Sequence, residues 1–243
     1  MFQKQTALVF IHYFGGDGGS WQWLSKKLPE KYNCIYLTLP GFGSTAPLEE
    51  INIRNFSQWI AHEIKARKLD DYILVGHSMG GKLALFTAFI NHDFLPQKIV
   101  LVAPSPPTTE GMSAKEKEQM LYHPDRDNAV ITVNSGTNKK LDKIKFNYTV
   151  ESQLKTDPLT WKWWIETGMN NDISWATKNL KIPTFIICSK NDPVITTQSI
   201  KDNVLPYLNK VKLVTFGRAG HLIPIESPRK LAKILKKILK VEG

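Results

Sequence analysis

The chain has 243 residues, 42% of them hydrophobic, and a formal net charge of +10 from 32 Lys and Arg against 22 Asp and Glu. This length suits one sizeable domain with a full core, and it leaves room for an inserted segment. The excess charge comes mainly from dispersed lysines, without an arginine-rich arm or a nucleic-acid-binding motif. We therefore expect a solvated basic surface and no nucleic-acid partner.

The N-terminal region and the cysteines bear on the cellular compartment. The apolar run 7–11 is too short for a signal peptide or a membrane span, which favours a cytoplasmic protein. Cys34 and Cys188 each lie in an apolar, strand-like stretch, so we expect two buried, reduced thiols. No spacing of Cys and His residues suggests a metal site, and we expect neither a metal nor an organic cofactor.

Short apolar stretches recur along the chain and are separated by helical segments. We expect strands at residues 6–11, 34–39, 72–75, 98–103, 184–188 and 212–216. Such strands are typical of an α/β fold with a mostly parallel sheet, here of about six strands, covered by helices on both faces. Ligands of these sheets bind at the carboxyl ends of the strands, so a site is expected in the loops that follow them.

Three helices of the sheet region have clear patterns. Residues 20–28 are expected to form a helix capped by Ser20, and residues 55–68 are amphipathic. A terminal helix from Pro228 alternates leucine and isoleucine with lysine. A basic amphipathic helix can bind an anionic membrane. We expect instead that its apolar face packs on the sheet and that its lysines face water.

The pattern changes between residues 105 and 177, where strand signals mostly disappear. Polar helical stretches at 113–121 and 139–155 flank residues 130–133, which are expected to form a short strand or a loop. Because this region separates the fourth and fifth strands, we predict a helical lid at 105–177, inserted into a core of 1–104 and 178–243. Four tryptophans gather here, mostly to pack the lid, with one or two reaching the cleft: Trp161, Trp163, Trp164 and Trp175.

The sequence Gly76-His77-Ser78-Met79-Gly80 joins the strand at 72–75 to an apolar helical segment at 82–90. A serine becomes an exposed nucleophile only where the turn is so sharp that flanking side chains would collide, which explains the glycines. The following helix also directs free N–H groups and its positive dipole end at the reacting atom. Ser78 is therefore the predicted nucleophile.

A serine hydroxyl needs a neighbouring base, and that base needs an acid to orient it. Of the six histidines, His221 is the best placed, in a glycine-bounded loop after the last strand. Asp192 directly follows the fifth strand and is the candidate acid. Candidate oxyanion donors are the backbone N–H groups of Met79, after the nucleophile, and of Phe14, after the first strand. For His12 we expect a structural role, with hydrogen bonds to the backbone of its own loop.

Together these residues resemble the α/β-hydrolase fold superfamily, in its lid-bearing serine hydrolase or esterase type. The resemblance extends from residue 7 to about 228 and follows the family's order of nucleophile, acid and histidine. It rests on motifs that begin at His12, Pro40, Gly76, Asp192 and Gly220. The chain departs from the pattern at Tyr13, where the family usually has glycine, and it has no room for antiparallel strands before the first parallel strand. Serine at position 78 disfavours members with an aspartate nucleophile, such as dehalogenases and epoxide hydrolases.

The resemblance implies a serine hydrolase that cleaves small or medium carboxylic esters through an acyl-enzyme, with Ser78, His221 and Asp192 as the reacting group. The expected partner is a small-molecule ester. Alternatives remain open, because a fold does not fix a substrate. They are cleavage of a thioester or a C–C bond, an elimination, a slow-turnover ligand-binding protein, and a peripheral membrane lipase anchored by the terminal helix. The oligomeric state and physiological substrate stay open.

Overall fold

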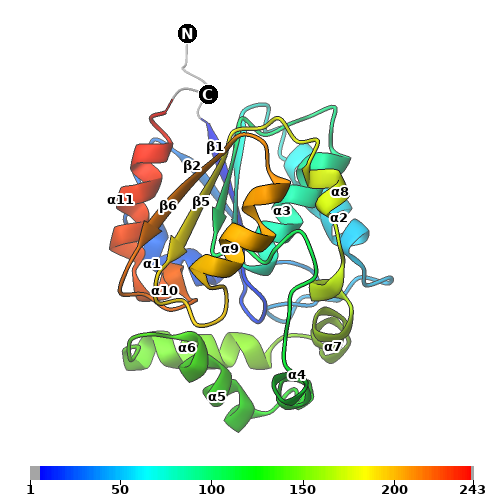
Figure 1. The fold of residues 1–243 in the computed structure, drawn as a ribbon, viewed down its shortest axis with the longest axis vertical. Helices are drawn as coiled ribbons and strands as arrows, with labels where there is room; N and C mark the ends of the chain where they lie inside the picture. Colours follow the sequence, from blue (N-terminus) through cyan, green and yellow to red (C-terminus); the bar gives the residue numbers. More distant parts are fainter. Residues whose placement is uncertain (1–5, 242–243) are drawn as a thin grey trace.

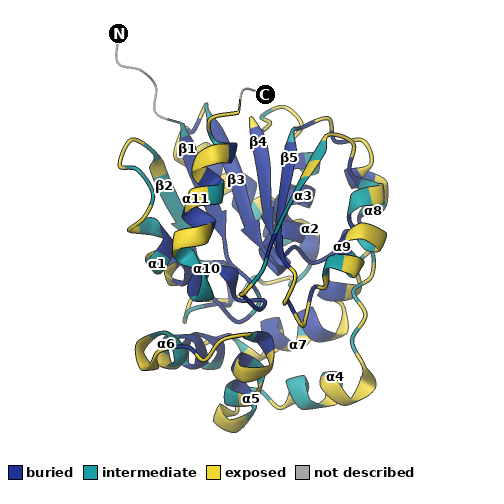
Figure 2. Cartoon of the chain, turned by 60° about the vertical axis from the view of Figure 1, so that its left-hand side comes forward, coloured by how far each residue is buried: buried dark blue, intermediate teal, exposed yellow. Residues whose placement is uncertain are grey.

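The computed structural model describes residues 6–241 and contains one six-stranded sheet in the order β2-β1-β3-β4-β5-β6. Every neighbouring pair of strands is parallel. The strands are β1 (Ala7–Ile11), β2 (Asn33–Leu37), β3 (Tyr72–His77), β4 (Lys98–Val102), β5 (Thr184–Ser189) and β6 (Val211–Phe216). The six predicted strands are confirmed. The inner strands are buried on both faces, whereas β2 at one edge is partly exposed (Figure 2).

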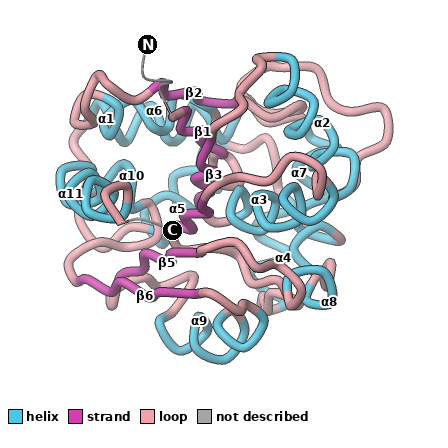
Figure 3. The backbone as a smooth tube through the Cα atoms, turned by 90° about the horizontal axis from the view of Figure 1, so that it is seen from above, coloured by secondary structure: helices cyan, strands magenta, loops and turns pink. Residues whose placement is uncertain are grey.

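Helices cover both faces of the sheet (Figures 1 and 3). One face carries α1 (Gln22–Ser25), α10 (Ile223–Glu226) and α11 (Pro228–Ile238), and the other carries α2 (Ile53–Ala66), α3 (Met79–Ile90), α8 (Ser174–Thr177) and α9 (Thr197–Asn203). In β1, Leu8 and Phe10 point to the first face and Val9 and Ile11 to the second. This alternation places an apolar core on each side, and the predicted α/β fold class is confirmed.

The prediction of a helix at 20–28 is wrong about where the helix starts and how long it is. A 3-10 turn, Gly18–Trp21, precedes the four-residue α1. Its cap is Asp17, whose carboxylate accepts a hydrogen bond from Gly19 N at 2.7 Å. Ser20 belongs to the same capping box, because its hydroxyl accepts from Asp17 N at 3.1 Å. The capping residue thus lies three positions before the serine that the sequence favoured.

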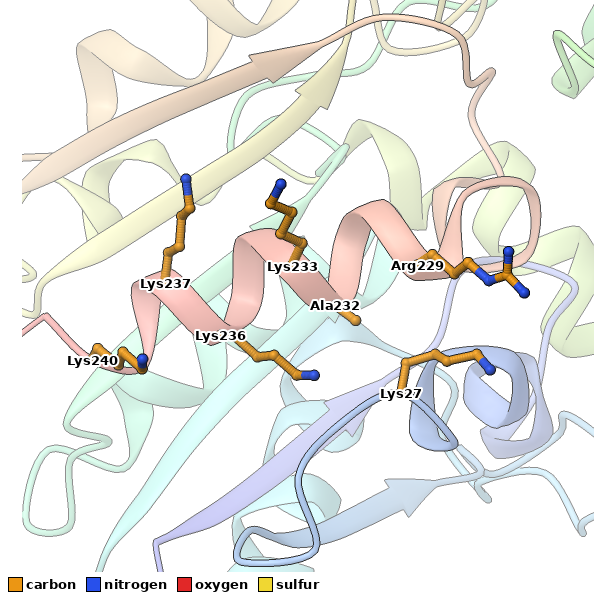
Figure 4. A pocket seen from close by; sticks show the side chains of 7 residues that line it. All are labelled: Lys27, Arg229, Ala232, Lys233, Lys236, Lys237 and Lys240. Atoms are coloured by element: carbon orange, nitrogen blue, oxygen red, sulfur yellow. The ribbon is translucent and has the colours of Figure 1, made fainter.

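The terminal helix α11 packs as expected. Leu231, Leu235 and Ile238 are buried against the sheet, whereas Lys233, Lys236, Lys237 and Lys240 are exposed (Figure 4). They line a groove of about 450 Å³ together with Lys27 of the segment after α1. The basic side chains are thus concentrated along this helix more than the sequence indicated. None of the helices within residues 6–241 has the length and apolar character needed to cross a membrane.

Both cysteines are free thiols. Cys188 is buried within β5, whereas Cys34 is only half-buried because β2 is an edge strand. Burial raises the pKa of both thiols. The expectation of unpaired cysteines is confirmed, although Cys34 is more accessible than predicted.

A helical insertion separates β4 from β5 and lies beyond the end of the sheet to which the strands point (Figures 1 and 2). It consists of α4 (Ala114–Leu121), α5 (Arg126–Gly136), α6 (Lys143–Leu154) and α7 (Pro158–Glu166). Residues 130–133 lie within α5, so the expected strand or loop is wrong there. Asp125 caps this helix at Asn128 N, and Val133 is buried in one apolar cluster with Leu222 and Ile225 of the core. Tertiary packing thus overrides the β-branched local sequence.

The tryptophans of this region do not form one cluster. Trp161 and Trp164 are buried, and Trp161 Nε1 donates to Met120 O at 2.6 Å. Trp163 is half-buried against α2. Trp175 is 55% exposed on α8, where it contacts Phe89 of α3. Trp161 thus packs within the insertion as expected, the rings of Trp161 and Trp163 also contact the core residues Phe14 and Phe56, and Trp175 lies apart from them.

Candidate active site

The turn between β3 and α3 holds Ser78 in an unusual backbone conformation, with φ 53° and ψ −119°. A Cβ at Gly76 would lie 2.3 Å from Gly80 O, and a Cβ at Gly80 would lie 2.4 Å from Ile11 O. The two glycines are therefore required by close backbone approach, as predicted. Ser78 N donates to Val102 O at 3.0 Å, which fixes the turn to the neighbouring strand. The serine thus stands at a strained strand-to-helix turn.

The three side chains predicted to act together are in hydrogen-bond contact. His221 Nε2 lies 2.9 Å from Ser78 Oγ, and His221 Nδ1 lies 3.0 Å from Asp192 Oδ2. The other Asp192 oxygen accepts from Val194 N and Ile195 N, each at 2.9 Å. All three side chains belong to residues that are largely buried, so these contacts are sheltered from water.

The Asp192 carboxylate affects both the pKa and the tautomer of the His221 imidazole. Burial by itself lowers the pKa of His221, but the nearby Asp192 charge, its hydrogen bond, Glu110 and Glu226 together raise this pKa above 6.5. With Nδ1–H donating to Asp192, the neutral ring presents the unprotonated Nε2 to the Ser78 hydroxyl. His221 is therefore oriented to take the serine proton.

The loop that carries His221 is fixed by contacts that the sequence did not reveal. His77 Nε2 donates to His221 O at 2.9 Å, and His221 N donates to Gly136 O of α5 at 2.7 Å. Glu226 accepts from Gly220 N at 2.7 Å through one carboxylate oxygen. Its other oxygen accepts from Asn138 N and Lys139 N, both at 3.1 Å. Glu226 thus joins the histidine loop to the loop between α5 and α6.

The two predicted oxyanion donors have free N–H groups. Within residues 6–241, no acceptor is hydrogen-bonded to the backbone N–H of Phe14 or of Met79. Met79 begins α3, where a helix has no internal partner for this group. The loop after β1 lies against the start of α3, because a Cβ at Gly80 would be only 2.5 Å from His12 O. The Phe14 ring packs on Trp161, with centroids 4.2 Å apart.

His12 supports the backbone of its loop, as predicted. Its Nδ1 donates to Tyr13 O at 2.8 Å, and its Nε2 accepts from Leu39 N at 3.1 Å. Burial lowers the pKa of His12 to about 4, so the ring is neutral and can serve as acceptor at one nitrogen. The imidazole therefore joins the loop after β1 to the start of the segment after β2.

A serine hydrogen-bonded to an imidazole, which a buried carboxylate orients, is arranged for nucleophilic attack on a carbonyl carbon. Within the described residues, no group of three His, Cys, Asp or Glu side chains is arranged to hold a metal ion. The six-stranded parallel sheet and the serine turn define the class of α/β hydrolases. The family model described as the alpha/beta hydrolase family matches residues 8–234, and the chain belongs to this family.

Several relatives cover nearly the whole chain. A Haemophilus influenzae protein, provisionally named 2-succinyl-6-hydroxy-2,4-cyclohexadiene-1-carboxylate synthase, is 27% identical over 96% of this chain and 98% of its own. A pimeloyl-[acyl-carrier protein] methyl ester esterase of Legionella pneumophila is 26% identical over 88% of this chain and 87% of its own. The structure of an esterase from Exiguobacterium antarcticum superposes with a TM-score of 0.87 at 18% identity, covering 97% and 92% of the two chains.

Proposed function

We propose that the protein is a serine hydrolase that cleaves small or medium carboxylic esters, its substrate a small-molecule ester. The observation that carries this proposal is the hydrogen-bond chain from Ser78 Oγ through His221 to Asp192. The free N–H groups of Phe14 and Met79 add a place for the negative charge that develops on a carbonyl oxygen. Nucleophile, base, acid and oxyanion donors are the complete set that acyl transfer requires.

In the proposed mechanism, Ser78 Oγ attacks the ester carbonyl carbon while His221 Nε2 takes its proton. Asp192 stabilises the imidazolium, and the two backbone N–H groups hold the oxyanion. The tetrahedral intermediate collapses to an acyl-enzyme as the alcohol leaves with the proton from His221. A water molecule, deprotonated by the same imidazole, then attacks the acyl carbon. Release of the carboxylic acid restores Ser78.

A second candidate is an elimination, in which the triad removes a proton without forming an acyl-enzyme; the Haemophilus influenzae relative is named a synthase and not an esterase. The similarity over nearly the full length of both chains favours keeping this candidate. The two functions differ in one observable, the covalent intermediate. Trapping an acyl group on Ser78 during turnover supports the esterase, whereas turnover without an adduct supports the elimination.

The experiment for the main proposal is a series of p-nitrophenyl esters from acetate to dodecanoate, measured with the wild-type protein and with Ser78→Ala. We expect turnover by the wild type and a loss of about 10⁵- to 10⁶-fold in the variant, because the three side chains act as a unit. The chain-length optimum then sizes the acyl pocket. A purified, folded Ser78→Ala protein that keeps a tenth of the activity contradicts the proposal.

A further inference from the structure

A second carboxyl group is held beside the nucleophile by the segment that follows β4. Ser105 N donates to Ser78 O at 3.1 Å, so this segment touches the nucleophile residue itself. The Ser105 hydroxyl donates to Glu110 Oε2, and Glu110 N donates to Met169 O at 3.1 Å. The position of Glu110 is therefore fixed at both its backbone and its side chain.

The Glu110 carboxyl group faces the same region as the reacting side chains. His221, Lys82 and Asp192 are near enough for their charges to shift the pKa of Glu110, and the Ser105 hydrogen bond ties its carboxyl group to the segment that touches Ser78. Among the described residues, only Ser105 forms a hydrogen bond with the Glu110 side chain, through Oε2. Glu110 Oε1 therefore has no partner among these residues, and Glu110 is partly exposed. Burial raises the pKa of Glu110, while the Ser105 hydrogen bond and the charges of His221 and Lys82 oppose this shift. An accessible carboxyl oxygen without a partner in the protein is an acceptor that a substrate can use.

Lys82 does not neutralise this carboxyl group by direct contact. Its side chain is fully buried, and Nζ donates to Thr108 O at 3.0 Å and to Met169 O at 2.9 Å. Two backbone carbonyls thus hold the ammonium group at the base of the helical insertion. A buried cation already bound in this way is poorly placed to receive a carboxylate from a substrate.

We propose that Glu110 lines the substrate site and selects esters that carry a hydrogen-bond donor, above all an ammonium group, while it rejects esters that carry a carboxylate. The inference rests on the proposed ester hydrolysis and names its substrate class. A substrate ammonium, amide N–H or hydroxyl donates to the open Oε1 next to Ser78. A substrate carboxylate instead meets the like charge of Glu110 in a sheltered environment, where repulsion is stronger than in water.

The test uses two matched sets of esters at pH 7.5. One set varies the acyl group of a p-nitrophenyl ester among 6-aminohexanoate, hexanoate and the monoester of adipate. The other varies the alcohol of a butyrate ester among 6-aminohexanol, hexanol and 6-hydroxyhexanoate. In each set the ammonium nitrogen and the carboxylate oxygens lie the same number of bonds from the ester, and the neutral member ends in a methyl group; the two sets cover both sides of the scissile bond. Each kcat/KM is divided by that of the neutral member, so that general losses of activity cancel.

In at least one set, we expect kcat/KM of the wild type to be about 30-fold higher for the ammonium ester than for the carboxylate ester. Glu110 attracts the ammonium group and repels the carboxylate, and both effects at close range add to this ratio. Glu110→Gln keeps the shape and the Ser105 hydrogen bond, and it should reduce this ratio to within about threefold. The matched control is Glu118→Gln, an exposed carboxylate of α4, which should leave the ratio unchanged.

Three results overturn the inference: equal turnover of charged members in both sets by the wild type, preference for the carboxylate esters, or a ratio unchanged in Glu110→Gln. The first two results are measured on the wild type alone, so the inference can still be tested if Glu110→Gln does not fold. Absence of turnover of the neutral members of both sets contradicts the proposed ester hydrolysis instead.

Discussion

The imidazole Nε2 of His221 lies 2.9 Å from the hydroxyl of Ser78, although 143 residues separate them in the sequence. Ser78 follows β3, and His221 follows β6, with β4 and β5 between these strands in the sheet. The loop after β6 must therefore reach across two strands. The contacts that hold this loop in place are as necessary to the proposed reaction as the reacting side chains.

Changing Asp192 to Asn tests the orientation of the imidazole. The side-chain oxygen can still accept from Val194 N and Ile195 N, so the fold should persist. The amide NH2 would then face His221 Nδ1 and favour the tautomer with the proton on Nε2, which cannot accept from Ser78. We expect kcat to fall about 10⁴-fold. Asp93→Asn, at an exposed position, is the control and should change kcat less than twofold.

The dependence of activity on pH follows from the raised pKa of His221. The base must be neutral, so kcat/KM should be low at acidic pH and rise as the imidazolium loses its proton. Because the pKa lies above its ordinary value of 6.5, the midpoint of this rise should also lie above 6.5. Initial rates with a neutral ester between pH 5 and 9 measure it. A flat profile, or a midpoint well below 6.5, argues against His221 as the base.

Glu226 offers a test of the link between the histidine loop and the helical insertion. Glu226→Ala removes the acceptor of three backbone N–H groups and should destabilise the protein by about 1.5–3 kcal/mol, as for hydrogen bonds to a charged group. Looser positioning of His221 should also lower kcat. Hydrogen exchange should become faster at residues 138, 139 and 220. Glu166→Ala, an exposed position of α7, is the control; equal effects of both changes would refute the link.

Gly76 provides a test of the nucleophile turn. A methyl group here would lie 2.3 Å from Gly80 O, so Gly76→Ala must shift the turn or fail to fold. We expect a loss of stability of about 1–3 kcal/mol, typical of overpacking, and a large loss of ester turnover in the fraction that folds. A Cβ at Gly111 meets no atom within 4 Å, so Gly111→Ala should leave both quantities nearly unchanged. If Gly76→Ala has the same melting temperature and turnover as the wild type, close packing does not define the turn.

The sheet and the nucleophile turn could be predicted because their signals are local. Buried parallel strands require continuous apolar residues, and a close approach of backbone to backbone requires glycine, as at Gly76 and Gly80. The positions of Asp192 and His221 follow from the carboxyl ends of strands. These rules act within a few residues of each position and can be read without knowing the tertiary structure.

The remaining features depend on contacts between distant segments. Residues 130–133 are rich in β-branched side chains, and the helix is favoured by the Asp125 cap and by packing of Val133 on the core. Glu110, five residues beyond Ser105, resembles any polar residue of a loop until the fold joins it to Ser105, whose N–H donates to Ser78 O. Glu226 likewise gains its role only through the loop between α5 and α6. No local sequence pattern predicts such contacts between distant segments.

The most direct measurement of the central claim is the intact mass of the protein after reaction with a fluorophosphonate probe, followed by mapping of the labelled peptide. If Ser78 is an activated nucleophile, the wild type gains the mass of one probe, located on Ser78, and Ser78→Ala gains none. Labelling should also weaken in Asp192→Asn. A folded wild-type protein that stays unlabelled, or that carries the probe at another residue, contradicts the account.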